Sequence, residues 1–246
     1  MEIQAKKISQ FTGNEGGIYA LCGGRENFTM FSCGSGKLIR KWNIKAASAY
    51  DFALRFPMSL YSILCIKEKN WLLCGTSDGT LVCLNLADKS LLQEIKLSQA
   101  ALFDIKFSKA NNLICVASGD GILFFIDATN FEIKSSTKLC QEKVRNMDLN
   151  QAESELALAC GDGSLRIFDL LTLKEKIKLE AHRFSANSIK FHPNGKHLIS
   201  GGKDALLKIW ERTRDENYQL QQEIPAHNYA IYSIDFHPEQ KYFATA

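Results

Sequence analysis

Large apolar residues recur in this chain at a constant interval of 42 residues. They are Trp42, Leu84, Ile126, Phe168 and Trp210, and a polar or acidic residue follows each of them. A constant interval over consecutive units indicates an internal repeat, in which each unit is one supersecondary structure that buries its hydrophobic face against its neighbours. The repeat constrains the fold more strongly than local propensities do, and it favours a function based on a binding surface.

Each unit contains four short segments with strand character. In the fifth unit, the β-favouring segments 186–191, 196–201 and 203–212 are separated by turn signals that contain Gly, Asn or Asp. A fourth strand follows the closing apolar residue, as in 90–97 and 174–181. A period of about 40 to 45 residues with this pattern is typical of a propeller blade. We therefore predict an all-β fold, a β-propeller of four-stranded antiparallel blades.

The fifth unit resembles the WD-repeat β-propeller family, and the resemblance extends over essentially the whole chain. The family's hydrogen-bonded tetrad corresponds here to His182 before the first strand, Ser200 in the second, Asp204 in the turn and Trp210 in the third. Such a tetrad would give the buried indole and imidazole groups their hydrogen-bond partners. The earlier units depart from this pattern, and the histidine position is taken by Asn14, Ser98 and Cys140.

The register predicts five complete blades and a partial sixth in a single domain. The repeats cover about 12–53, 54–95, 96–137, 138–179 and 180–224, and residues 225–246 begin a sixth. Residues 1–11 align with 169–179, so we expect them to form the closing strand of the last blade. The sixth closing residue is expected at about position 255, so we interpret the chain as C-terminally truncated, about 50 residues short of seven blades. Exposed blade edges would then favour self-association.

Composition and charge narrow the classes of function. A chain of 246 residues with 46% hydrophobic residues and only 4 prolines is expected to fold around a large core. The net charge of +3 and the lack of a Lys/Arg cluster argue against a nucleic-acid partner. No stretch has the length of a membrane span, and the N-terminal sequence has no apolar signal-peptide core. We therefore expect a cytoplasmic protein with protein or peptide partners and no membrane partner.

The reactive side chains of the sequence form no recognisable catalytic or metal motif. The eight cysteines include no Cys-x-x-Cys pair, and we interpret them as small buried hydrophobic residues without metal or disulfide. No two of the five histidines have metal-ligand spacing on one element. The Ser, His and Asp residues of the fifth unit are assigned to the buried tetrad rather than to nucleophilic catalysis. We predict no cofactor and no catalytic residue.

One position in the first strand of each repeat collects aromatic and polar side chains. These residues are Tyr19, Tyr61, Phe103, Arg145, Asn187 and Tyr232. The resemblance places this position at the mouth of the central channel on the top face, with a polar rim of Ser59, Lys143, Ser185 and Lys203. Aromatic and Arg side chains are enriched in interaction hot spots. The alternative is that the aromatic residues only fill the channel as packing.

Three functions remain open at this point. The favoured one is a non-catalytic scaffold that binds peptide segments or partner proteins on the top face of the propeller. The chain could instead be a sensor or structural module of a larger multidomain protein. The third is a propeller hydrolase, which would need carboxylates or histidines around the channel to hold a metal. The six channel positions contain none of these residues.

Overall fold

The computed structural model describes residues 6–246, and every regular element in this range is a β-strand. The strands form five four-stranded antiparallel sheets and one two-stranded sheet, which confirms the predicted all-β fold with four-stranded blades. Among the described residues, no helix has the length and hydrophobicity needed to cross a bilayer. The chain divides into two compact units, Met1–Lys96 and Leu97–Ala246. The sequence predicted one domain, and the division falls close to the expected boundary between the second and third repeats.

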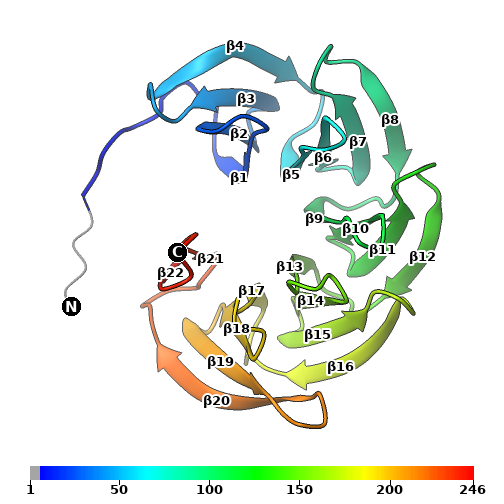
Figure 1. The fold of residues 1–246 in the computed structure, drawn as a ribbon, viewed down its shortest axis with the longest axis vertical. Coiled ribbons are helices and arrows are strands. Elements are labelled where there is room, and N and C mark those ends of the chain that lie inside the picture. The colour runs from blue at the N-terminus through cyan, green and yellow to red at the C-terminus, as the bar shows by residue number, and fades with distance from the viewer. Residues whose placement is uncertain (1–5) are drawn as a thin grey trace. The chain divides into compact units, whose positions relative to one another are not determined.

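The first unit contains two sheets, which we number 1 and 2 in chain order (Figure 1). Sheet 1 consists of β1 (Ile18–Gly23), β2 (Thr29–Gly34), β3 (Leu38–Asn43) and β4 (Ser48–Arg55). Sheet 2 consists of β5 (Leu60–Ile66), β6 (Trp71–Thr76), β7 (Thr80–Asn85) and β8 (Leu91–Lys96). Both sheets contribute to one hydrophobic core, in which Phe31 and Ile39 of sheet 1 join Leu60 and Leu72 of sheet 2.

The second unit contains sheets 3, 4 and 5 and the two-stranded sheet 6 (Figure 1). Sheet 3 consists of β9 (Leu102–Ser108), β10 (Leu113–Ser118), β11 (Ile122–Asp127) and β12 (Ile133–Lys138). Sheet 4 consists of β13 (Val144–Leu149), β14 (Glu155–Cys160), β15 (Ser164–Asp169) and β16 (Lys174–Glu180). Sheet 5 consists of β17 (Ala186–Phe191), β18 (His197–Gly202), β19 (Leu206–Arg212) and β20 (Tyr218–Pro225), and sheet 6 of β21 (Ile234–Phe236) and β22 (Phe243–Thr245).

Burial along the strands explains why the repeat is visible in the sequence. The second strands β10 and β14 are buried at every residue, whereas residues of the fourth strands β12 and β16 alternate between exposed and partly buried. A strand covered on both faces needs a continuous apolar run, whereas a strand with one solvated face tolerates polar residues. The closing residues Trp42, Leu84, Ile126, Phe168 and Trp210 are all buried. The 42-residue period therefore reports one core position that every sheet must fill.

The N-terminal segment differs from the prediction of a closing strand at 1–11. Residues 1–5 lie outside the described residues, and residues 6–11 form no strand. The first strand of the described chain is β1, which begins at Ile18. No described strand pairs with residues 6–11. Without a partner, the backbone N–H and C=O groups of an extended segment cannot join a ladder.

In the second unit, side chains at one repeat position connect the first strands of successive sheets. These side chains are Asp104 on β9, Asn146 on β13 and Ser188 on β17. The Asp104 side chain accepts a 2.8 Å hydrogen bond from the backbone N–H of Met147, and the Asn146 side chain accepts one of 3.0 Å from the backbone N–H of Ile189. The Ser188 hydroxyl accepts a hydrogen bond of 3.0 Å from the backbone N–H of Ile234 on β21. Each sheet is thus held to the next by a bond to the backbone as well as by apolar packing.

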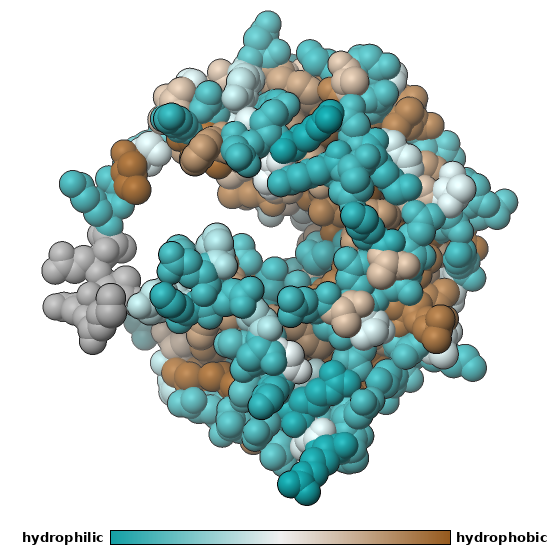
Figure 2. All heavy atoms as spheres, in the orientation of Figure 1, coloured by the Kyte–Doolittle hydropathy of each residue, from teal (hydrophilic) through white to brown (hydrophobic). Residues whose placement is uncertain are grey.

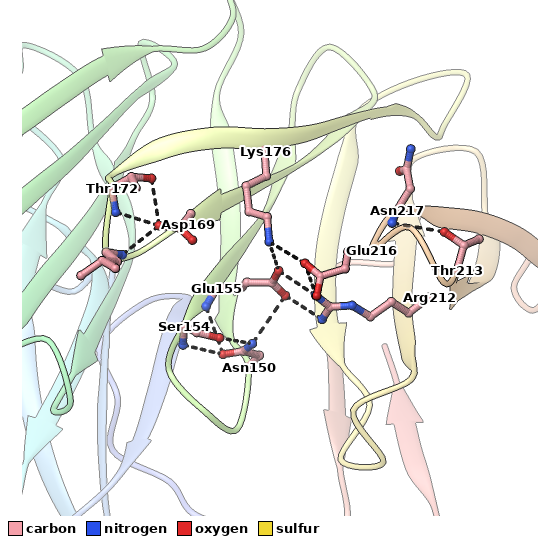
Figure 3. Close-up of polar contacts among 11 residues, drawn as sticks. Asn150, Ser154, Glu155, Asp169, Thr172, Lys176, Arg212, Thr213, Glu216 and Asn217 are labelled. Atoms are coloured by element: carbon pink, nitrogen blue, oxygen red, sulfur yellow. Dashed lines mark hydrogen bonds and ion pairs between the residues drawn. The ribbon is translucent and has the colours of Figure 1, made fainter.

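A buried carboxylate makes a second connection between sheets 4 and 5 (Figure 3). The side chain of Glu155, at the start of β14, is 3% exposed. Its Oε1 lies 2.9 Å from Nζ of Lys176 on β16, and its carboxylate also takes two bonds of 2.9 and 3.0 Å from the guanidinium of Arg212 on β19. Oδ1 of Asn150 accepts a 3.1 Å hydrogen bond from the backbone N–H of Glu155 and so fixes the backbone at this residue. The two cations compensate a charge that would otherwise be costly to bury.

We expect Glu155→Ala to lower the free energy of unfolding by about 2 kcal/mol. Removing one partner of a buried ion pair typically costs about 3–5 kcal/mol, and we reduce this value because the Lys176 and Arg212 side chains are 30% and 24% exposed. The matched control is Glu180→Ala, because Glu180 pairs with Lys178 on the surface of the same sheet. Such an exposed pair contributes less than about 1 kcal/mol. Equal losses in urea denaturation would contradict this assignment.

Candidate functional site

The structure brings the four tetrad residues of sheet 5 together in one hydrogen-bonded chain. Nδ1 of His182 lies 2.9 Å from Oδ1 of Asp204, and its Nε2 lies 2.9 Å from Oγ of Ser200. The indole N–H of Trp210 donates to the same Oγ at 3.0 Å. A neutral His182 with its proton on Nδ1 lets all four side chains form their hydrogen bonds, because Nδ1 then donates to Asp204 and Nε2 accepts from the Ser200 hydroxyl. The Ser200 residue is fully buried, so no substrate can reach its oxygen and these groups are structural.

Burial controls the protonation of His182. Burial lowers the pKa of His182 below the ordinary value of 6.5, and the neighbouring Asp204 carboxylate opposes this shift without cancelling it. The imidazole is therefore neutral in the folded protein at neutral pH. The unfolded chain binds a proton more readily, so the tetrad's contribution to stability is present above pH 6.5 and decreases as the pH falls toward the folded-state pKa.

We expect wild-type protein to lose stability between pH 7.5 and 5.5, and we expect His182→Asn to reduce this dependence. Asparagine is chosen because Asn14 occupies the position equivalent to His182 in sheet 1, where its Oδ1 accepts a 2.9 Å hydrogen bond from the Ser32 hydroxyl. The variant should be about 1 kcal/mol less stable at pH 7.5, because hydrogen bonds are lost. Denaturation at several pH values measures both effects. Identical slopes for the two proteins would contradict the neutral buried histidine.

The other sheets use the same positions with different side chains. In sheet 1, the Trp42 indole donates to Ser32 at 2.8 Å, and Ser32 donates to Asn14. In sheet 3, Ser98 donates to the turn residue Asp120 at 2.8 Å. In sheet 6, Nε2 of His227 lies 2.7 Å from the Thr245 hydroxyl. Sheets 1, 3 and 6 therefore keep a polar link between the segment before the first strand and the sheet, whereas sheet 2 has Phe56 at the histidine position.

In the first unit, the predicted interface residues Tyr19 and Tyr61 lie in direct contact. Their ring centroids are 4.8 Å apart with an interplanar angle of 36°. Tyr19 is 49% exposed, so the pair presents aromatic surface to solvent. The predicted rim residue Ser59 immediately precedes β5, and its hydroxyl donates to the Ser35 carbonyl at 3.4 Å. These residues form an aromatic patch on this unit.

In the second unit, predicted interface and rim residues form one contact chain. The Arg145 guanidinium lies 5.9 Å from the Phe103 ring centroid, and Nζ of Lys143 lies 5.4 Å from the same centroid. Nε of Arg145 donates to the Ser185 hydroxyl at 3.2 Å. The Ser185 hydroxyl in turn donates to Oδ1 of Asn187 at 2.9 Å. We call Phe103, Lys143, Arg145 and Ser185 the β9–β17 surface.

Three other predicted residues have different surroundings. Asn187 is 4% exposed and its Nδ2 donates to the Ile231 carbonyl at 3.0 Å, so it positions Ser185 instead of offering a contact surface. Tyr232 is 67% exposed. Lys203 is exposed, and its backbone N–H donates to the Ser185 carbonyl at 2.8 Å. Tyr232 precedes β21 instead of lying in it, whereas the other five predicted residues are each the second residue of the first strand of a sheet. The sequence pattern could not show which of these side chains are buried.

Figure 2 shows hydrophilic residues over most of the face in view, with smaller hydrophobic patches between them. The partly exposed Phe103 ring lies beside two cations, those of Lys143 and Arg145. Aromatic and Arg groups form the centres of protein interfaces more often than Lys-rich polar surface does.

The sequence analysis missed a cluster formed by Cys140, Cys160 and Asp162. Their ligand atoms lie within 4.8 Å of one another. The cysteines were expected to be buried hydrophobic residues, but Cys22, Cys65 and Cys140 are only partly buried. No short motif marks the pair, because the fold joins a loop residue to the end of a distant strand. The repeat register was the available signal, since Cys140 occupies the family's histidine position.

Repeated four-stranded sheets that carry this tetrad define a protein built from blades of the WD type. Residues 173–211 and 218–246 match the family model of the WD domain, G-beta repeat. The part of the chain between residues 173 and 246 therefore carries repeats of the WD40 family. Proteins of this family are typically interaction scaffolds and are usually non-catalytic.

Two curated proteins resemble parts of the chain. Polyadenylation factor subunit 2 of Gibberella zeae is 42% identical over 45 residues, which is 18% of this chain and 7% of that protein. DDB1- and CUL4-associated factor 13 of Dictyostelium discoideum is 33% identical over 58 residues, which is 24% of this chain and 13% of that protein. The matches therefore span only a small part of either relative.

Proposed function

We propose that this chain is a non-catalytic scaffold that binds peptide segments or partner proteins through residues at the start of its first strands. The observation that carries the proposal is the β9–β17 surface, where a partly exposed Phe103 ring lies beside the cations of Lys143 and Arg145. An aromatic surface flanked by fixed cations fits an apolar or aromatic side chain with an acidic group nearby. The names of both relatives describe members of protein assemblies, which supports protein partners.

The arrangement of the β9–β17 surface also favours binding over catalysis. Arg145 is oriented by Ser185, and Ser185 is fixed by the buried Asn187. An oriented guanidinium binds a carboxylate with less loss of side-chain entropy than a free one. The six predicted interface positions carry no carboxylate or histidine that could act as a general base or metal ligand. The near-neutral charge of +3 further favours protein partners over nucleic acid.

We expect Phe103→Ala to weaken the binding of a partner peptide by at least about thirtyfold, because truncating an aromatic anchor costs about 2 kcal/mol or more. Arg145→Ala should weaken binding of the same partner and reduce its dependence on salt. Lys203→Ala is the control, because this exposed lysine lies outside the contact chain. The partner is first recovered by affinity purification and identified by mass spectrometry, and calorimetry then measures the dissociation constants.

Each variant must retain the wild-type unfolding transition, since Phe103 also contacts the protein interior. Negligible losses of affinity for both Phe103→Ala and Arg145→Ala would contradict the proposed interface. These residues would then serve as packing, and the binding surface would lie elsewhere on the sheets.

A further inference from the structure

The cluster of two thiols and a carboxylate in sheet 4 has a reactive arrangement. Cys140 lies in the loop between β12 and β13, Cys160 is the last residue of β14, and Asp162 lies in the turn to β15. The three ligand atoms lie within 4.8 Å of one another. Cys160 is fully buried and Cys140 is only partly buried. A small reagent in solvent can therefore reach the first thiol of the pair, while the second lies behind it.

The repeat shows that position 160 faces position 140. The equivalent residues of sheet 5 are Gly202 and His182. A Cβ atom at Gly202 would lie only 2.5 Å from Nδ1 of His182 and 2.7 Å from Oδ1 of Asp204. A side chain at this position therefore occupies the space that the histidine ring fills in sheet 5. In sheet 4, Cys160 supplies that side chain and the smaller Cys140 replaces the ring.

Sheet 3 provides an unreactive version of the same arrangement. Its equivalent residues are Ser98, Ser118 and Asp120, and both serine hydroxyls donate to the carboxylate. Two hydroxyls at these positions are thus compatible with the fold. Thiols are weaker hydrogen-bond donors than hydroxyls, but they are open to oxidation.

Cys140 differs from the other cysteines in its acidity. The S–H of Cys160 donates to the Cys140 sulfur and holds the pKa of Cys140 below its ordinary value, although burial opposes this shift. The negative charge of Asp162 also opposes the lowering of the Cys140 pKa, whereas the Arg166 cation favours it. The same hydrogen bond, together with burial, raises the pKa of Cys160. Burial raises the pKa of the remaining six thiols, Cys22, Cys33, Cys65, Cys74, Cys83 and Cys115.

We propose that Cys140 and Cys160 form a peroxide-sensitive thiol pair that converts reversibly to a disulfide. The Cys140 thiolate attacks one oxygen of hydrogen peroxide, the O–O bond breaks, and the departing hydroxide takes a proton to leave as water. Cys140 is then a sulfenic acid. The Cys160 sulfur attacks the Cys140 sulfur, the S–O bond breaks, and the hydroxide leaves with the Cys160 proton as a second water. Two thiols lose two electrons in total, and one peroxide is reduced to two waters.

The surroundings of Asp162 favour this chemistry over metal binding. Its Oδ1 already accepts bonds from the Ser164 N–H and hydroxyl at 3.0 and 2.6 Å. Its Oδ2 lies 3.4 Å from the guanidinium of Arg166. A cation bound between the two sulfurs would be repelled by this guanidinium, whereas a thiolate is stabilised by it. The inference is independent of the proposed scaffold function, since Cys140, Cys160 and Asp162 are not residues of the β9–β17 surface.

The test treats the reduced full-length chain with one equivalent of hydrogen peroxide at pH 7. We expect peptide mass spectrometry to detect a Cys140–Cys160 cross-link that a dithiol reverses. We expect Cys140 to be oxidised at least about tenfold faster than Cys65, which is also partly buried but has a raised pKa. Cys160→Ser should stop the reaction at the sulfenic acid, which dimedone traps on Cys140.

The double variant Cys140→Ser with Cys160→Ser is the matched control. It reproduces the two serines of sheet 3, so it should fold and should lack the fast oxidation phase. Oxidation of Cys140 at the rate of Cys65, or absence of the Cys140–Cys160 cross-link, would overturn the proposal. Stoichiometric Zn²⁺ binding that requires both cysteines and prevents the cross-link would also overturn it and would assign a metal site instead.

Discussion

Within each of the two units, the packing of one sheet against its neighbour is the constraint on which the rest of the structure depends. A four-stranded sheet of this size cannot bury its apolar faces alone. The closing residues, such as Trp42 and Phe168, are buried in all five four-stranded sheets. In the second unit, Asp104, Asn146 and Ser188 add hydrogen bonds from one first strand to the next. These bonds fix the register of neighbouring sheets, whereas apolar packing alone would resist sliding less strongly.

This constraint explains which parts of the structure could be predicted from the sequence. The 42-residue period predicts the sheets because every sheet must fill the same core position, and the tetrad of His182 follows from the register. The Glu155 ion pairs were not predictable, because no sequence motif links Glu155 to Lys176 in another strand or to Arg212 in the next sheet. For the same reason the contact of Cys140 with Cys160 was missed, and the burial of Asn187 could not be read from its strand position.

Departures from the repeat mark the places where this chain differs chemically from one sheet to another. The tetrad position holds a histidine in sheet 5, a serine in sheet 3 and a thiol in sheet 4, yet the local backbone is the same. The strand position of the β9–β17 surface likewise carries Phe103, Arg145 and Asn187 in successive sheets. A repeated backbone thus supports side chains with separate roles, because each sheet's stability depends mainly on core positions that do not vary in character.

Native-state hydrogen exchange tests the central claim most directly. If side chains on the first strands hold successive sheets together, the Ile189 amide should exchange as slowly as amides in the centre of β14. Asn146→Ala should accelerate exchange of Ile189 by at least about tenfold. Asn130→Ala, which removes a similar bond to the Glu132 amide within one turn, should leave Ile189 unchanged. Rapid exchange of Ile189 in the wild type, or unchanged exchange in Asn146→Ala, would contradict the claim.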